Sequence, residues 1–287
     1  MQTLTQIKEL LDARALRPKK SLGQNFLIDQ NLIRKLVDAS GAGDGSVVLE
    51  VGPGTGTLTE ELLSRGCIVV ACELDDELAA LLQDRIPPLL PPDQQHRFTL
   101  VHSDCLDGKR AVSPRVLEAL GGRGFSLVAN LPYSAATPLI STLLIDHPRC
   151  ALLAVTIQRE VADRLAAAPG SKDYGGLAVL AQALAEVKHV ATLGRECFWP
   201  RPDVTSSMVL LTRRAAPLVA DPRALSAFLR DLFTQRRKQV GAVLGRGIDW
   251  PAVASEPGCE GISATMRAEQ LSVEGILALG RALGRIR

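Results

Sequence analysis

The sequence predicts an α/β protein in which a mostly parallel sheet of about seven strands is followed by a smaller, all-helical domain. Between residues 46 and 216, short apolar runs alternate with stretches of helical periodicity, which is typical of strand–helix–strand units. After residue 217 the pattern is helical alone. The chain has 287 residues, of which 46% are hydrophobic, and this is enough to bury the core of such a sheet.

The strands predicted for this sheet are short apolar runs bounded by turn-forming residues. They are residues 47–51, 67–72, 97–101, 125–129, 151–156, 187–193 and 207–212. The helices predicted between them are residues 58–64, 75–85, 114–120 and 138–145. For the last helix, Thr137 fits an N-cap and Pro138 fits the first helical position. Residues 87–92 hold four prolines, so we expect a surface excursion that continues neither helix nor strand.

The tail after residue 217 carries two helical patterns. One has five apolar side chains at the spacing of an amphipathic helix, namely Leu225, Phe228, Leu229, Leu232 and Phe233. Another follows Ser272, which fits an N-cap. We therefore expect a helical N-terminal segment of residues 1–45, an α/β domain of residues 46–216 and a helical domain of residues 217–287.

The charge of the chain is unevenly distributed. Residues 1–35 carry a formal charge of +4, residues 36–199 carry −7 and residues 200–287 carry +5. Basic ends favour a polyanionic partner, although a solvated surface gives the same pattern. The six cysteines have neither paired nor metal-ligand spacing, and no apolar run is long enough for a membrane span. We expect a cytoplasmic protein with free thiols, no metal and no membrane contact.

Glycines and acids stand at the ends of the first three predicted strands. The first strand leads into Glu50-Val-Gly-Pro-Gly-Thr-Gly56, where glycines allow close backbone approach to a ligand at a helix start. Glu73 ends the second strand and could accept both hydroxyls of a ribose, and Asp104 follows the third and could accept from an adenine amino group. Singly, each acid is more typical of a loop cap. A dinucleotide fingerprint would need glycine at Thr57, so NAD is disfavoured.

The segment Asn130-Leu-Pro-Tyr133 follows the fourth predicted strand. An exocyclic aromatic amine is a poor nucleophile, and hydrogen-bond acceptors on its two hydrogens free its lone pair for attack on a methyl group. The Asn130 side-chain oxygen and the Leu131 carbonyl, held outward by Pro132, would be those acceptors. Tyr133 would offer a face for stacking on a purine. A tight turn before a helix also fits the segment, but it does not explain an aromatic ring beside an amide acceptor.

The glycine loop and its two acids resemble the class I S-adenosylmethionine-dependent methyltransferases, which have a Rossmann-like fold. Asn-Leu-Pro-Tyr is similar to the Asn/Asp-Pro-Pro-Tyr type motif of amino-methyltransferases, in the form used by the ribosomal RNA adenine N6,N6-dimethyltransferases. Residues 19–27 resemble the cofactor-covering segment of that family, and residues 198–206 resemble its Phe-x-Pro-x-Pro-x-Val-x-Ser loop. The family is also matched at residues 171–175, 235–238 and 266–272, so the resemblance covers nearly the whole chain.

The resemblance implies methyl transfer from S-adenosyl-L-methionine to two adjacent adenines in the 3′-terminal hairpin of 16S ribosomal RNA, within the 30S precursor, by a monomer. It implies catalytic roles for Asn130, Leu131, Pro132 and Tyr133, with Phe198 facing the target base. The cofactor contacts that it implies are Asn25, Leu27, Gly52, Gly54, Glu73, Asp104 and Asn130. The RNA contacts that it implies, besides Tyr133 and Phe198, are Lys19, Lys20, Arg236, Arg237 and Lys238.

Two other functions remain open at the level of sequence. A 23S ribosomal RNA adenine methyltransferase of the macrolide-resistance type shares the Asn-x-Pro-Tyr motif and the proline-containing loop. A non-catalytic RNA-binding assembly or transcription factor could keep the fold. The chain departs from the family pattern at Ser134, where Asn or His is common, and at residues 87–92. Neither departure touches the two acceptors.

Overall fold

The computed structural model describes residues 1–108, 111–245 and 247–287 and divides the chain into two compact units. Unit 1 comprises Met1–Leu143, His147–Arg159 and His189–Leu210, and unit 2 comprises Leu144–Asp146, Glu160–Lys188 and Leu211–Arg287. The second unit therefore begins well before the predicted boundary at residue 217. Within the described residues, no helix has the length and apolar character needed to cross a membrane.

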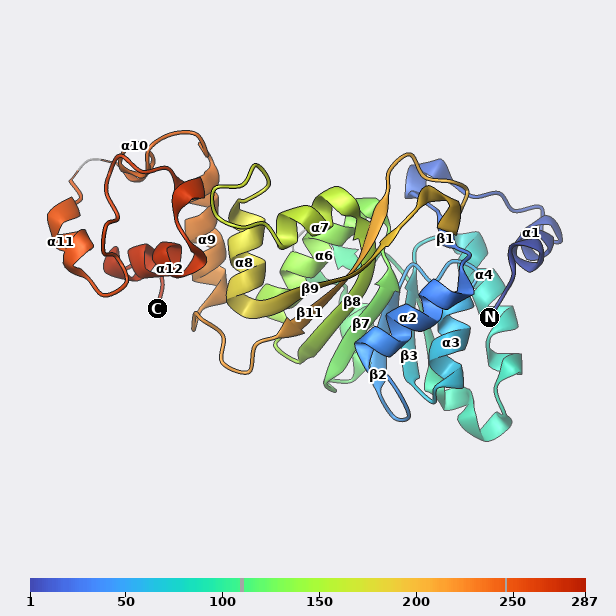
Figure 1. Cartoon of the computed structure of the whole chain (residues 1–287). Coiled ribbons are helices and arrows are strands. Elements are labelled where there is room, and N and C mark those ends of the chain that lie inside the picture. The colour runs from blue at the N-terminus through green and yellow to red at the C-terminus, as the bar shows by residue number, and fades with distance from the viewer. Residues whose placement is uncertain (109–110, 246) are drawn as a thin grey trace. The chain divides into compact units, whose positions relative to one another are not determined.

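All seven predicted strands are present and form one sheet in the order β4-β3-β2-β7-β8-β11-β9 (Figure 1). Their bounds are β2 (Val47–Val51), β3 (Ile68–Glu73), β4 (Phe98–His102), β7 (Phe125–Asn130), β8 (Cys150–Gln158), β9 (Ala185–Leu193) and β11 (Ser206–Arg213). Strand β2 pairs in parallel with both β3 and β7, and the parallel pairing continues to β4 and β8. The order of strands thus reverses at β2, which is where doubly wound sheets bind ligands.

Helices cover both faces of the sheet because alternate residues of each strand point to opposite sides. On one face, Val48, Val69 and Val128 form a buried cluster with side chains of α2 (Gln30–Ser40), α3 (Thr57–Ser64) and α4 (Asp76–Arg85). Helix α5 (Pro114–Leu120) contacts β3 and β4, and α6 (Tyr133–Asp146) buries Leu139, Ile140 and Leu143. Expected helix positions between the strands are therefore confirmed.

Helix α6 begins five residues earlier than predicted, at Tyr133, and contains Pro138 in its interior. The prediction of Thr137 as its N-cap is wrong. Pro132 fixes the backbone at φ −54° just before the helix, and its carbonyl accepts a hydrogen bond from Ala135 N at 3.0 Å. Burial of Leu139 and the residues after it keeps the helix continuous past the proline.

The N-terminal segment forms α1 (Leu4–Asp12), the 3-10 turn η1 (Lys20–Leu22) and the short strand β1 (Phe26–Leu27). Strand β1 pairs antiparallel with β10 (Phe198–Trp199), and β5 (Leu106–Asp107) pairs with β6 (Ala111–Val112). The proline-rich stretch forms the 3-10 turns η2 (Pro87–Leu89) and η3 (Pro92–Arg97), so it continues neither α4 nor β4, as predicted.

Unit 2 is mostly helical. It contains α7 (Arg159–Leu165, from its second residue), α8 (Gly176–Leu184), α9 (Pro222–Phe233), α10 (Val240–Leu244), α11 (Trp250–Ser255), η5 (Ala268–Gln270) and α12 (Val273–Ala282). The predicted N-cap Ser272 accepts a hydrogen bond from Gly275 N at 3.0 Å. Helices α7 and α8 were not predicted. Six of the nine residues of α8 are buried, so it packs on nearly all sides and lacks the polar face that reveals a surface helix.

Candidate active site at the carboxyl ends of the strands

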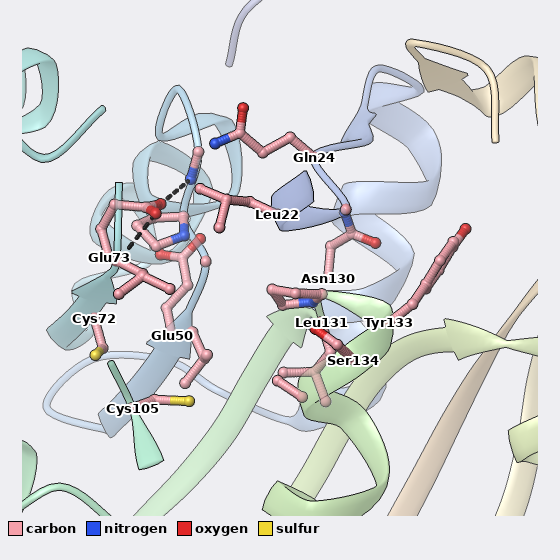
Figure 2. A pocket seen from close by; sticks show the side chains of 18 of the residues that line it. Leu22, Gln24, Glu50, Cys72, Glu73, Cys105, Asn130, Leu131, Tyr133 and Ser134 are labelled. Atoms are coloured by element: carbon pink, nitrogen blue, oxygen red, sulfur yellow. Dashed lines mark hydrogen bonds between the residues drawn. The ribbon is translucent and has the colours of Figure 1, made fainter. Parts of the chain in front are cut away.

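A cavity of about 640 Å³ opens where β2, β3 and β7 end, beside the reversal of strand order. Its lining comes from the glycine loop after β2, from residues 72–74 and 103–106, from residues 130–138, and from residues 21–27 of the N-terminal segment. This volume lies within the range of small-molecule sites, roughly 300 to 1,000 Å³. Figure 2 shows Glu50 and Glu73 on one side of the cavity and Asn130, Leu131 and Tyr133 on the other.

The glycine loop holds a conformation that side chains would disturb. Gly52 and Gly54 both have positive φ, at +69° and +61°. A Cβ on Gly54 would lie 2.7 Å from the Phe26 ring, and one on Gly52 would lie 3.1 Å from Pro132. The loop is thus closed on one side by β1 and on the other by the turn after β7, and it leads into the start of α3 at the cavity. This geometry fits a nucleoside-containing cofactor.

Glu73 ends β3 as predicted and is only 6% exposed. Its Oε1 accepts from Leu74 N at 2.9 Å and Asp75 N at 3.0 Å, and its Oε2 accepts from Gly54 N at 3.2 Å. Burial raises the pKa of Glu73, while these three backbone donors oppose the rise. The carboxylate therefore has a fixed orientation at the cavity wall and retains lone pairs that can accept ribose hydroxyls.

Asp104 also lines the cavity, on the loop after β4, and its Oδ1 accepts from Leu106 N at 2.9 Å. It is exposed, whereas the neighbouring thiols of Cys72 and Cys105 are buried. Burial raises the pKa of Cys72 to about 11 and that of Cys105 to about 12. Both thiols are therefore neutral at physiological pH and form an apolar wall next to the Asp104 carboxylate. All six cysteines are free, in agreement with the prediction.

Two further polar groups at the cavity were not singled out from the sequence. Glu50 at the end of β2 is 1% exposed, and Thr59 Oγ1 donates to its Oε2 at 2.7 Å. Burial raises the pKa of Glu50 to about 8, so this carboxyl is mostly protonated at pH 7. Thr57 Oγ1 is buried without a hydrogen-bond partner among the described residues, and Thr57 lines the cavity. The sequence could have indicated Glu50, because an acidic residue within a fully buried strand is costly and therefore unusual.

The turn after β7 brings the four predicted catalytic residues together. Asn130 Nδ2 donates to the backbone carbonyl of Asn25 at 3.0 Å, and no described group donates to its Oδ1. Leu131 N donates to Thr156 O on β8 at 3.0 Å, and within the described chain its own carbonyl receives no hydrogen bond. Tyr133 is half-buried, and its hydroxyl lies 3.1 Å from Ser206 Oγ. Figure 2 shows Asn130 and Leu131 at the cavity and Tyr133 directed away from Glu50 and Glu73.

Residues 19–27, here called the strap, run along the cavity. The predicted cofactor contacts Asn25 and Leu27 line it, together with Gln24. Lys19, in contrast, is not placed as a free phosphate contact. Its Nζ lies 2.8 Å from Asp75 Oδ2 and 2.7 Å from Glu77 Oε2, so two carboxylates neutralise its charge.

Phe198 differs from its predicted role. It is 3% exposed, belongs to the buried cluster on one face of the sheet, and does not line the cavity. Its neighbour Trp199 points the other way along the strand and stacks on Phe26 with ring centroids 6.3 Å apart. The alternation of a strand therefore assigns Phe198 to the core, and its predicted contact with the target base does not fit this structure.

Basic side chains gather around a separate hollow of about 800 Å³ in unit 2. Its lining residues are Gly170, Ser171, Lys172, Thr234, Gln235, Arg236, Arg237, Lys238, Arg267 and Glu269. Arg237 and Lys238 are exposed, as a phosphate contact requires, and so is Lys20 in unit 1. Arg236 instead pairs with Glu269 at 2.8 Å and donates to Lys172 O at 2.6 Å and Ser171 O at 3.0 Å. The Arg236 guanidinium therefore stabilises the hollow by joining Glu269 to the backbone of residues 171–172.

Comparison with known proteins identifies the family of the chain. A family model described as ribosomal RNA adenine dimethylase matches residues 15–283. A relative from Streptomyces avermitilis, named Ribosomal RNA small subunit methyltransferase A, is 42% identical over 272 residues, covering 93% of this chain and 89% of the relative. A relative of the same name from Phenylobacterium zucineum is 40% identical over 285 residues, covering 98% and 94%.

Solved structures share the fold. The 23S rRNA methyltransferase ErmE is 25% identical with a TM-score of 0.67, and the match covers 90% of this chain and 99% of that one. A dimethyladenosine transferase from Plasmodium falciparum is 21% identical with a TM-score of 0.72, covering 90% and 97%, which is a likeness of fold. The predicted class I methyltransferase fold is confirmed. From its match to the family model over most of its length, the chain belongs to the ribosomal RNA adenine dimethylase family.

Proposed function

We propose that this protein transfers methyl groups from S-adenosyl-L-methionine to N6 of two adjacent adenines in the 3′-terminal hairpin of 16S ribosomal RNA, acting as a cytoplasmic monomer on the 30S precursor. The observation that carries the proposal is the orientation of Asn130. Its Nδ2 is engaged by the Asn25 carbonyl, so its Oδ1 is turned to accept a hydrogen bond. The Leu131 carbonyl beside it supplies a second acceptor.

Two acceptors are what methylation of an adenine amine requires. Each acceptor takes a hydrogen bond from one N–H group of the amine. The nitrogen then becomes more tetrahedral, and its lone pair is released from the ring. The bound cofactor supplies an electrophilic methyl group. Tyr133, whose hydroxyl is fixed by Ser206, offers its ring as a stacking surface for the purine. The methylated ammonium is acidic enough to lose its proton to water, so the site needs no strong base.

The cavity residues divide between the parts of the cofactor. Glu73 would accept the ribose hydroxyls, and Asp104 would accept from the adenine amino group beside the neutral thiols of Cys72 and Cys105. The glycine loop would approach the remainder through the backbone of Gly52 and Gly54. Asn25 and Leu27 of the strap would cover the bound cofactor.

The small-subunit substrate is favoured over the 23S alternative by the names of the relatives near 40% identity, whereas ErmE is 25% identical. The exposed cations Lys20, Arg237 and Lys238 would neutralise phosphates around an adenine that has left its stack. An intact pair of acceptors disfavours the non-catalytic alternative.

Methylation of 30S and 50S subunits that lack these modifications, with labelled cofactor, tests the proposal. We expect label in two adjacent adenines of 16S RNA. Label confined to 23S RNA would refute the choice of substrate, and no label in either subunit would refute catalysis. Asn130→Ala should abolish transfer while the cofactor dissociation constant stays within a few-fold of wild type, since Glu73, Asp104 and the glycine loop are unchanged. Full activity in this variant would refute the acceptor mechanism.

A further inference from the structure

Four polar side chains tie the strap to the start of α4. We call Lys19, Gln24, Asp75 and Glu77 the latch. Lys19 Nζ and Gln24 Nε2 both reach Asp75 Oδ2, at 2.8 and 3.0 Å, and Lys19 N donates to Gln24 Oε1 at 2.7 Å. The side chain of Asp75 is 1% exposed, whereas Glu77 is 52% exposed. The central ion pair is therefore shielded on its Asp75 side, and the Glu77 arm is open to solvent.

Asp75 joins the latch to the cofactor wall. Its Oδ1 caps α4 by accepting from Glu77 N at 3.0 Å and Leu78 N at 3.2 Å, which leaves Oδ2 for the strap. Its own N–H donates to Glu73 Oε1 at 3.0 Å. Burial acts to raise the pKa of Asp75, but the Lys19 contact and the other hydrogen bonds outweigh it, so the pKa lies below its ordinary value. Asp75 thus stays charged and connects Glu73 to the strap.

The strap in turn reaches the catalytic turn. Asn25 follows Gln24 directly, and its carbonyl accepts the amide of Asn130 at 3.0 Å. Asn25 Nδ2 bonds back to Gly23 O at 3.1 Å, which stiffens the same short segment. Hydrogen bonds therefore link Glu73 to Asp75 and Asp75 to Gln24, and the backbone leads from Gln24 to Asn25, whose carbonyl contacts Asn130.

We propose that the latch is a positioning device: it holds the Asn25 carbonyl where it fixes the Asn130 amide, so the same contacts that close the strap over the cofactor also aim the catalytic acceptor. This inference rests on the proposed function, because the acceptor role of Asn130 does. It assigns Lys19 to positioning rather than to RNA. It also couples cofactor binding and methyl transfer through one segment.

Lys19→Met is the informative variant, because it keeps the aliphatic length and removes the charge. We expect its cofactor dissociation constant to rise about tenfold, since the closed strap becomes a minor population. We expect the single-turnover rate at saturating cofactor and RNA to fall about tenfold as well, because a loosely held Asn130 is misaligned. Lys19→Arg should restore both quantities to within about threefold, since the ion pair is retained.

Two further variants guard against a folding artefact. Gln24→Met removes the second arm without touching the ion pair, and its saturated rate should fall in the same direction. Glu77→Gln loses only the exposed arm, so its saturated rate should fall less than that of Lys19→Met, because exposed ion pairs contribute little. Circular dichroism melting of each variant verifies that the fold persists.

The outcomes separate the possibilities. The slope of log binding constant against log salt for RNA should be unchanged in Lys19→Met, whereas a phosphate contact would reduce it by about 0.7 to 0.9. A reduced slope, or an unchanged rate at saturating cofactor in folded Lys19→Met and Gln24→Met, would overturn the latch. If wild-type protein labels no 30S adenine, the proposed function fails instead, whatever the variants do.

Discussion

Asn130 and Asn25, 105 positions apart in the chain, are joined by one hydrogen bond of 3.0 Å from a side-chain amide to a backbone carbonyl. The bond gives the amide a direction, with its nitrogen toward the strap and its oxygen toward the substrate side. Asn130→Asp tests that direction, because a carboxylate can still accept from an adenine amine but cannot donate to Asn25. We expect a loss of about 10²-fold or more in the methylation rate, comparable to the loss of a preorganised polar group. Activity near wild type in a single-turnover assay would contradict it.

The glycine loop predicts a contrast between two alanine variants. Gly54→Ala places a Cβ 2.7 Å from the Phe26 ring, whereas Gly45→Ala, at similar positive φ, meets nothing within 4 Å. Both should lose about 1 to 2 kcal/mol of unfolding free energy from backbone strain. Only Gly54→Ala should also raise the cofactor dissociation constant, by more than about tenfold, because β1 must move off the loop. Equal affinities in titration calorimetry would show that Phe26 adapts without consequence.

Glu50 predicts a pH dependence with a definite sign. The folded protein keeps the Glu50 proton up to a pKa of about 8, and the unfolded chain releases it near 4.5. Between these values the unfolded state binds fewer protons, so the unfolding free energy falls with rising pH, by about 1.4 kcal/mol per pH unit for this one group. Glu50→Gln should lack this contribution. Urea unfolding of the wild type and of Glu50→Gln from pH 5 to 8.5 measures how the unfolding free energy of each depends on pH. Parallel pH profiles for the two proteins would exclude the Glu50 contribution.

Tyr133 is predicted to act through its ring. Tyr133→Phe and Ser206→Ala each remove one partner of the same hydrogen bond. Both should therefore raise the RNA Michaelis constant to a similar extent, by less than about tenfold. Tyr133→Ala removes a stacking surface worth about 1 to 3 kcal/mol, so it should raise that constant about 5- to 150-fold. A Tyr133→Phe variant as impaired as Tyr133→Ala would assign the role to the hydroxyl instead.

In the basic hollow of unit 2, we expect Arg237 to bind RNA and Arg236 to stabilise the fold. Replacing Arg237 and Lys238 together by alanine should lower the salt slope of RNA binding by about 1.4 to 1.8, with the melting temperature unchanged. Arg236→Ala should lower the melting temperature, because it breaks an ion pair with Glu269 and two hydrogen bonds to backbone carbonyls. Filter binding at several salt concentrations, with calorimetric melting, distinguishes them. A stable Arg236→Ala protein with a lower slope would reverse the assignment.

The sheet and the place of residues 130–133 at the cavity could be predicted because each leaves a local mark in the sequence. Strand periodicity identified all seven strands, and Glu73 and Asp104 line the cavity because they stand at strand ends. Where charge alone supported a role, the prediction was less secure. The resemblance and the positive charge of Lys19 and Arg236 both favour RNA contacts, but their partners Asp75 and Glu269 lie far away in the chain. Only the tertiary structure reveals such neutralisation.

The burial of Phe198 and the presence of α8 could not be predicted for a related reason. Whether an aromatic ring in a two-residue strand faces a ligand or the core depends on its pairing partner, which is Leu27 for Phe198. Helix α8 has too few polar residues for its period to be recognised. In both cases the deciding quantity was the environment of the side chain after folding, and composition carries little information about it.

The Leu131 carbonyl has a consequence for how this enzyme can be inactivated. The hydrogen bond from Leu131 N to Thr156 O of β8 holds this peptide segment and so fixes the direction of the carbonyl. The Leu131 side chain is buried, at 2% exposure. Every amino acid brings the same carbonyl, so no single substitution at position 131 deletes this acceptor. The two positions should therefore differ in their tolerance of substitution. Position 131 should tolerate other apolar residues of similar volume, whereas almost any substitution at position 130 should abolish activity.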